Sequence, residues 1–143
     1  MAPARDPRSG PPGWPAPVRP VDAPGWRDDA VAWLLDLCPA DFRAYDGWRR
    51  HPVMLAWIAE RHVAGQVEVL RQAWRDVRLQ VGVHVPPEAL PSLMEHMAAE
   101  GRRLAEARRG AELLSEALVA VGEAERRHHD AVLEALEVAL AVE

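Results

Sequence analysis

The residues of this chain whose types and spacing best suit metal binding lie near the end of the sequence. Glu125 stands three positions before His128 and four before His129, so on a helix the carboxylate lies within about one turn of both imidazoles. A di-iron carboxylate bundle needs two Glu-x-x-His motifs and two further glutamates, and the sequence has one such motif. Stable zinc sites need three or four ligands. We interpret Glu125, His128 and His129 as solvated residues, with a metal-binding helical bundle as an alternative.

Cys38 is the only cysteine, so it cannot form an internal disulfide, and it fits a reducing compartment. Its position before Pro39 is a candidate helix N-cap, where the helix dipole favours a thiolate. A nucleophile also needs a base, and no neighbour in sequence supplies one. We interpret Cys38 as a packed thiol beside Leu37 and Phe42. The common phosphate-loop, hydrolase-elbow, zinc-protease and dithiol motifs do not occur, so we expect no catalytic residues and no cofactor.

Three arginines form a candidate phosphate-binding face. Arg71, Arg75 and Arg78 follow at steps of four and three, which places them on one side of a helix. Arginine supplies all 17 basic residues, as is typical of a high-GC genome, and the formal net charge of −5 disfavours recognition through phosphate neutralisation. Glutamates at helical pairing distances compensate most other arginines. A nucleic-acid-associated regulatory protein using this face is therefore a second alternative.

The helix that carries these arginines is predicted over Pro52–Val81. Proline fits the first helical position, and Gly82 suits a left-handed C-terminal cap. Apolar residues recur within the helix at alternating steps of four and three, the heptad repeat of coiled coils and helical bundles. This first seam comprises Val63, Val67, Leu70, Trp74, Val77 and Val81.

A second long helix is predicted from about Pro87–Pro91 to Val121, with Gly122 as its stop signal. Its seam comprises Leu93, Met97, Glu100, Leu104, Ala107, Ala111, Leu114, Leu118 and Val121. The connection between the two helices is short and holds two prolines, so the helices are expected to be antiparallel neighbours. We expect Trp74 to be the bulky residue that faces Ala107 and Ala111.

Shorter helices flank this hairpin. The pattern predicts a helix over 26–37 and a short one from Pro39 to Tyr45. A final helix over 123–142 has apolar residues around most of its circumference. That surface must be buried, and the sequence leaves open whether the helix returns to complete a bundle or belongs to an oligomer interface.

Residues 1–25 are rich in proline and glycine, which predicts a disordered arm. Two PxxP spacings occur, Pro12 to Pro15 and Pro17 to Pro20, and Trp14 lies inside this proline run, so the arm is either a solvated tail or a polyproline-II ligand. Trp48 stands in a polar approach to the long helix, where its ring either covers a helix end or docks a partner. Trp14 and Trp48 are thus candidate partner-binding residues, because tryptophan is enriched at binding hot spots.

The central block reads LLDLCPADFRAY, then RRHPVMLAWIAERHVAGQ, then HVPPEALPSLMEHMAAEGRRLAEARRGAELLSEAL. Over residues 34–118 this pattern resembles small helical proteins of unknown function encoded in actinobacterial genomes. The resemblance implies a compact helical domain with variable ends, and it implies no functional residues.

Together these patterns predict an all-α protein, an antiparallel long-helix hairpin within a three- or four-helix bundle. The predicted units are a disordered arm over 1–25, a helical domain over 26–121 and a C-terminal helix over 122–143. No apolar stretch is long enough to span a bilayer and no signal peptide is evident, so we expect a cytoplasmic location. The leading functional hypothesis is a non-catalytic interaction or adaptor protein that forms a homodimer or binds a helical partner.

Overall fold

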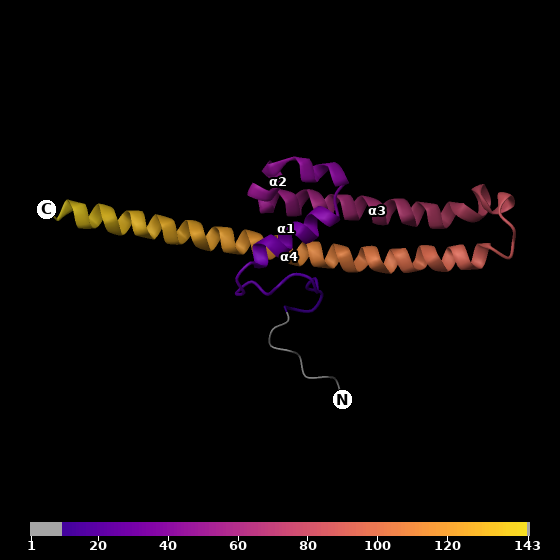
Figure 1. Cartoon of the computed structure of the whole chain (residues 1–143), viewed down its shortest axis with the longest axis horizontal. Coiled ribbons are helices and arrows are strands. Elements are labelled where there is room, and N and C mark those ends of the chain that lie inside the picture. The colour runs from indigo at the N-terminus through magenta and orange to yellow at the C-terminus, as the bar shows by residue number, and fades with distance from the viewer. Residues whose placement is uncertain (1–9, 143) are drawn as a thin grey trace, which may run out of the picture.

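The computed structural model describes residues 10–142, and within this range the chain is all-α as predicted. The elements are α1 (Trp26–Asp36), the 3₁₀ helix η1 (Ala40–Ala44), α2 (Asp46–Arg50), α3 (Pro52–Gln80), the 3₁₀ helix η2 (Gly82–His84) and α4 (Leu90–Ala141). Figure 1 shows α3 and α4 side by side as an antiparallel hairpin, with α1 crossing them and α2 lying over the start of α3. The elongated molecule is thus a hairpin with its small helices gathered in one region.

Helix α3 has the bounds that the sequence predicts to within one residue. Pro52 occupies its first turn, where a missing N–H costs no hydrogen bond. At its other end Gly82 has no positive φ, which among the described residues occurs only at Gly13 and Gly25. The predicted left-handed cap is therefore wrong, and the chain enters η2 directly.

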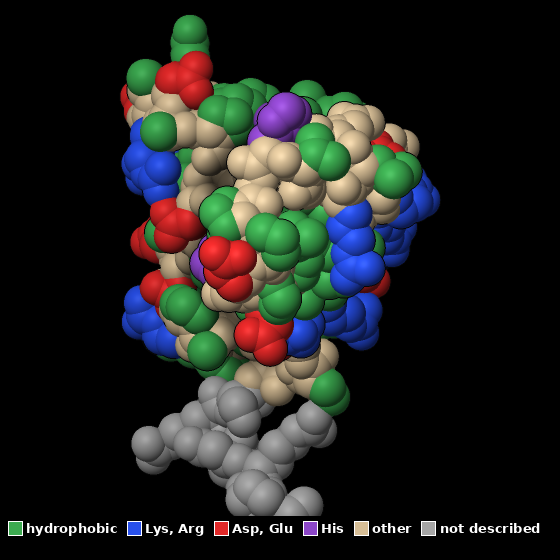
Figure 2. All heavy atoms as spheres, turned by 90° about the vertical axis from the view of Figure 1, so that its right-hand side faces the viewer, with side chains coloured by type: hydrophobic (Ala, Val, Ile, Leu, Met, Phe, Trp, Pro, Cys, Tyr) green, Lys and Arg blue, Asp and Glu red, His purple; other side chains and the backbone are tan. Residues whose placement is uncertain are grey.

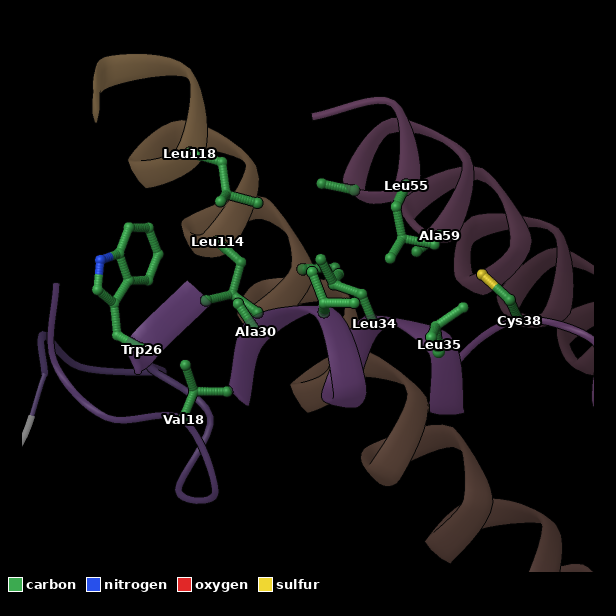
Figure 3. Close-up of a cluster of buried hydrophobic side chains, with 13 residues drawn as sticks. Val18, Trp26, Ala30, Leu34, Leu35, Cys38, Leu55, Ala59, Leu114 and Leu118 are labelled. Atoms are coloured by element: carbon green, nitrogen blue, oxygen red, sulfur yellow. The ribbon is translucent and has the colours of Figure 1, made fainter. Parts of the chain in front are cut away.

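The main core lies where α1 crosses the hairpin. Helix α1 contributes Leu34 and Leu35, α3 contributes Leu55, and α4 contributes Leu114, all almost fully buried (Figure 3). Alanines lie between these leucines and let the three helices approach closely. The buried set is Val18, Trp26, Ala30, Val31, Leu34, Leu35, Cys38, Leu55, Ala56, Ala59, Ala111, Leu114 and Leu118.

Burial of the two seams decreases toward the connected end of the hairpin. Val63 and Leu104 are buried in a second cluster, with Val67 and Leu70 packed against it. Val77 and Met97 are partly buried, whereas Trp74, Val81 and Leu93 are exposed. Met94 is buried in place of Leu93. Only two helices meet in this region, so a wide apolar face on either helix cannot be covered completely.

The predicted contact of Trp74 with Ala107 and Ala111 is wrong. Trp74 lies beside Met97, Ala98 and Gly101, because the antiparallel register brings residues near the connection together. The large ring over the small residues of α4 comes instead from α1. A Cβ added to Gly110 would lie 2.8 Å from the Trp33 ring and 2.9 Å from Pro15. Gly110 thus permits the close approach of α1 to α4, and the tryptophan that covers the small residues of α4 is Trp33, not Trp74.

Gly122 does not end the second long helix, so the predicted division at residue 122 is also wrong. Helix α4 continues through Gly122 to Ala141, and its total length of 52 residues corresponds to about 78 Å at 1.5 Å per residue. A single glycine costs a helix interior only about 1 kcal/mol relative to alanine, and the flanking residues are good helix formers. The predicted final helix is therefore the far end of α4.

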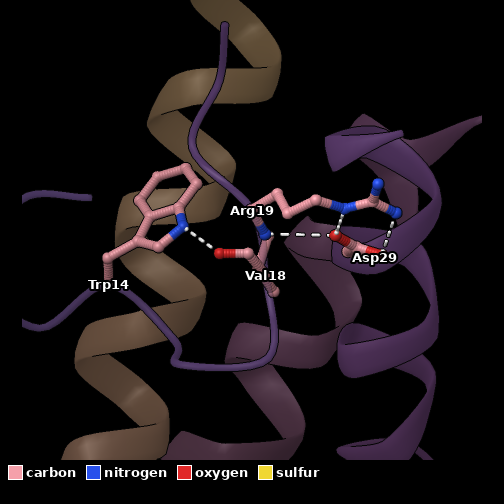
Figure 4. A network of polar contacts seen from close by, with 4 residues as sticks. All are labelled: Trp14, Val18, Arg19 and Asp29. Atoms are coloured by element: carbon pink, nitrogen blue, oxygen red, sulfur yellow. Dashed lines mark hydrogen bonds and ion pairs between the residues drawn. The ribbon is translucent and has the colours of Figure 1, made fainter. Parts of the chain in front are cut away.

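Residues 10–25 pack against the helices, so the expectation of a disordered arm is wrong for them. Val18 is buried in the main core, and the Trp14 ring lies 6.4 Å from that of Trp26. The indole Nε1 of Trp14 donates a 2.8 Å hydrogen bond to the Val18 carbonyl (Figure 4). The prolines limit the conformational entropy lost when such a segment docks. Residues 1–9 lie outside the described residues.

An ion pair fixes the other end of this segment to α1. Arg19 donates through Nε at 2.7 Å and Nη2 at 3.1 Å to the two Asp29 carboxylate oxygens, and its backbone N–H donates at 3.1 Å (Figure 4). These hydrogen bonds hold the pKa of the Asp29 carboxyl below its usual value. Gly25 then joins the segment to α1 with φ 83°, in the left-handed region that favours glycine.

Candidate functional site

A long exposed apolar surface lies on the far end of α4. We call residues 123–142 the projecting segment, because α4 extends there beyond the other helices (Figure 1). Every residue of the projecting segment is exposed. Its large apolar side chains are Val132, Leu133, Leu136, Val138, Leu140 and Val142. A helix in water ordinarily shows an apolar face only toward a partner.

The core face of α4 first carries Glu125 and His129 in the projecting segment and becomes apolar again at Val132 and Leu136. At 3.6 residues per turn, eighteen residues make five whole turns, so residues eighteen apart lie on one side of a straight helix. Val132 therefore lies on the same side as Leu114, and Leu136 on the same side as Leu118. Leu114 is fully buried and Leu118 nearly so, whereas Leu136 is 53% exposed. The same helix face is covered in the bundle and bare beyond it.

Charges on the projecting segment are divided along its length. Arg126 and Arg127 lie near the bundle, followed by His128 and His129, whereas the acidic Asp130, Glu134 and Glu137 lie toward the tip. Glu123 and Glu125 also lie near the bundle, so the base of the segment carries charges of both signs, whereas its tip is acidic. Because Arg126 and Glu137 are eleven residues apart, about three turns, they lie on the same flank of the apolar face.

The Glu125 and histidine cluster that suggested a metal site is placed at the base of the projecting segment. Arg27 of α1 donates a hydrogen bond to the Glu125 carboxylate, so this glutamate ties α4 to α1. His128 and His129 are fully solvated. Among residues 10–142 no group of three or more histidine, cysteine or acidic side chains is placed to hold a metal ion.

A second apolar surface is a groove between α2 and the outer face of α3, which we call the aromatic groove. It has a volume of about 1340 Å³ and lies on the side of α3 that faces away from α4. Trp48 stacks on Phe42 with ring centroids 4.9 Å apart, and Phe42 meets His62 edge to face at 5.5 Å. The lining residues are Asp41, Phe42, Ala44, Tyr45, Asp46, Gly47, Trp48, Arg50, His51, Val53, Met54 and Trp57.

Trp48 packs against the main core, and its docking of a partner stays a prediction. The ring is half-buried against Phe42 and the main core, and it also forms a wall of the aromatic groove. Trp57 is exposed, and Arg61 lies 3.8 Å over its ring. Sequence reasoning missed this groove, because it did not predict α2, which closes one side. The sequence signal that could have indicated this groove was the pair of consecutive apolar residues Val53 and Met54 at the start of α3, which the structure leaves exposed.

The arginine face is partly neutralised. Arg71 and Arg75 each lie 3.9 Å from a Glu68 carboxylate oxygen, and both also line a small groove with Trp74. Seen from the connected end of the hairpin, hydrophobic side chains cover much of the centre, with arginines at the sides (Figure 2). Nucleic-acid binding through Arg71, Arg75 and Arg78 stays a prediction.

Burial raises the pKa of two titratable groups in the bundle, Cys38 and Glu60, and so favours the neutral form of each. Cys38 is buried, and burial raises the pKa of its thiol, although the charge of Arg43 opposes the shift. The thiol therefore lacks the thiolate character of a nucleophile. Burial also raises the pKa of the Glu60 carboxyl on α3, and a hydrogen bond with Ser115 opposes that shift.

Within residues 10–142 no helix combines the length and the apolar character that crossing a bilayer requires. Comparison of the chain with protein-family models, curated proteins and solved structures finds no match. The resemblance to actinobacterial helical proteins therefore stays a prediction, and functional argument has to begin from the surfaces described above.

Proposed function

We propose that this chain is a non-catalytic interaction protein whose projecting segment pairs with a second helix. The α1–α3 bundle would serve as a rigid base, and the projecting segment would supply the docking face. One observation carries the proposal: the side of α4 that is buried at Leu114 and Leu118 is apolar again, and uncovered, at Val132, Leu136 and Leu140, beyond the polar Glu125 and His129.

The energetics of a lone helix support this assignment. Isolated helices of about 20 residues are marginal in water, because nucleation is costly and most helix stability in proteins comes from packing of an apolar face. The projecting segment receives helical nucleation from the bundle but no packing. A helix laid along Val132, Leu136 and Leu140 would supply it. Each leucine so buried contributes on the order of 2 kcal/mol.

The aromatic groove is not assigned to this function. It lies on the outer face of α3, whereas the projecting segment continues the inner face of α4, so one helix following α4 would not pass over Trp57. The arginine face near Arg75 lies toward the connected end of the hairpin and is remote from the projecting segment. Within one copy, pairing along α4 is therefore independent of both.

Hydrogen exchange tests the proposal when it is measured with a defined probe helix. The probe is a synthetic four-heptad helix with leucine at each a and d position. We expect its addition to slow amide exchange in residues 123–142 and to leave the core around Leu114 unchanged. The variant Leu133→Glu/Leu136→Glu should show no slowing, because both charges lie on the docking face. Exchange of the native segment that does not respond to the probe would refute helix pairing.

A further inference from the structure

We propose that the acidic tip of the projecting segment, residues 130–142, docks into the groove beside Trp74 on a second copy of the chain and runs parallel to α4 of that copy. This inference rests on the proposed function and adds the partner, its surface and the direction of packing. We call the surface the hairpin groove; it lies between α3 and α4 toward their connected end and has a volume of about 450 Å³. Within one copy this groove is remote from the acidic tip (Figure 1), so only a second copy can bring them together.

The hairpin groove is an apolar seat with basic charge. Trp74 of α3 and Met97 of α4 stand on its two walls, and the Trp74 residue is 43% exposed. The charged residues that line the groove are Arg71 and Arg75, whose side chains are 66% and 63% exposed. Each lies 3.9 Å from a carboxylate oxygen of the same Glu68, and one glutamate between two arginines leaves an excess of positive charge. The groove therefore suits an apolar helix with an acidic flank.

The acidic tip is such a helix. Its exposed Leu133, Leu136 and Leu140 lie within about 60° of one another around the axis. A stripe of acidic residues follows along one flank of this leucine face, and residues 130–142 contain no basic residue. The stripe comprises Asp130, Glu134 and Glu137. The leucine face is about 10 Å long and the groove about 12 Å from Met97 to Ala105, so His129, one turn before Leu133, lies beyond the groove.

The handedness of the helix sets the direction of packing. Seen from the connected end, as in Figure 2, α3 lies above α4 and α4 runs away from the viewer. Side chains of a right-handed helix that runs away follow one another clockwise, so Gly101 and Ala105, clockwise of the buried Leu104, place the groove on the right. A tip in this groove turns its leucines to the left. Its acidic stripe lies clockwise of the leucines, and so points up toward Arg71 and Arg75 only if the tip also runs away from the viewer.

Parallel docking makes the assembly open. An axis of two-fold symmetry along the helices would keep equal residues level, and an axis across them would reverse their direction. Neither brings a tip onto a groove about 50 Å back along a parallel α4. Each docked copy therefore keeps one free tip or one free groove, and further copies add end to end.

Light scattering of the full chain measures the assembly. We expect the average mass to rise past that of a dimer between about 10 µM and 1 mM. Arg71→Glu/Arg75→Glu and Glu134→Arg/Glu137→Arg should each weaken association at least roughly tenfold, because each places like charges together. Mixing these two variants should restore it, since the reversed tip fits the reversed groove and the native tip fits the native groove.

Arg102→Glu/Arg103→Glu is the matched control, with the same change of charge on α4. Arg103 lines the opposite side of the hairpin and Arg102 lines neither side. The control should leave the dependence of mass on concentration unchanged.

Spin labels on separate chains, in a Cys38→Ala background, measure direction. One chain carries Leu79→Cys near the connected end, and the other carries Ala131→Cys or Ala141→Cys. Parallel docking brings the label at 131 closer to that at 79 than the label at 141, and antiparallel docking reverses the order, because the two tip positions are about 15 Å apart.

Three results would overturn the inference and leave helix pairing intact: assembly that stops at a dimer, a control variant as damaging as the groove variant, or a label at 141 that is the closer one. A monomer at about 1 mM that still binds the synthetic leucine helix would do the same and assign the projecting segment to another partner. A monomer that does not bind that helix would overturn both proposals.

Discussion

The two halves of α4 make one comparison in which sequence pattern is held nearly constant and surroundings change. Residues 90–118 pack against α3 and α1, and their inner face is buried. The projecting segment has apolar residues on the same face from Val132 onward, and all of its residues are exposed. The difference teaches that the heptad pattern determines which face is apolar, whereas the extent of the neighbouring helices determines how much of it is covered.

The largest expected difference between the two halves of α4 is the loss of stability when a leucine on their common face is replaced by glutamate. Leu114→Glu buries an unpaired carboxylate in the main core, and a cost of several kcal/mol is comparable to the whole stability of such a domain. Leu136→Glu, five turns from Leu118, should leave the unfolding of the dilute monomer unchanged, because its side chain is already half in water. Urea denaturation followed by circular dichroism measures both. Equal losses would refute the distinction between a covered and an uncovered half.

Glycine substitutions should change stability in opposite directions in the two halves. Gly110→Ala should destabilise by about 1–3 kcal/mol, because the new methyl would lie 2.8 Å from the Trp33 ring. Gly122→Ala meets no neighbouring atom and should stabilise α4 by up to about 1 kcal/mol. Thermal unfolding of both variants beside the native chain decides this. Destabilisation by Gly122→Ala would indicate that the helix bends at this residue.

Removing one hydrogen bond tests whether residues 10–25 belong to the covered half. Trp14→Phe keeps an aromatic ring beside Trp26 but removes the indole donor to the Val18 carbonyl. The expected loss is about 1 kcal/mol, the usual net value of such a bond. Limited proteolysis should also cut residues 10–25 faster in this variant. Unchanged stability and cleavage would show that this segment does not contribute to the bundle.

The smallest expected effect is a pH dependence at the edge of the bundle. Burial raises the pKa of Glu60 above its ordinary value of 4.5, so the ionised carboxylate is less stable in the fold than in the unfolded chain. This penalty is absent below about pH 4.5 and appears as pH rises through the folded pKa. Glu60→Gln should therefore raise the free energy of unfolding at pH 7 by about 0.5 kcal/mol or less, and leave it unchanged at pH 4. Glu134→Gln in the projecting segment is the control, and an equal gain there would assign the effect to net charge.

Local signals in the sequence predicted most of the helices. Pro52 marks the start of α3, alternating steps of four and three mark both long helices, and the short connection makes them antiparallel. The wrong predictions are those in which tertiary packing overrode a local sequence rule. Gly122 would end the helix only if packing favoured a turn there, and α4 instead continues through it. The proline-rich segment would be disordered only if Trp14 and Val18 had no apolar surface to pack against, and the helices provide one.

For the candidate site, too, part was determined by the sequence and part only by tertiary packing. Sequence periodicity determined that residues 123–142 have more apolar surface than a solvated helix requires, and it determined the order of charges from Arg126 to Glu137. Only the tertiary structure decided that α4 runs straight past the bundle, which leaves Leu136 bare while Leu118 is buried. The physical reason is that a helix face is defined by covalent order and a 3.6-residue turn, whereas burial depends on which distant segments lie against that face.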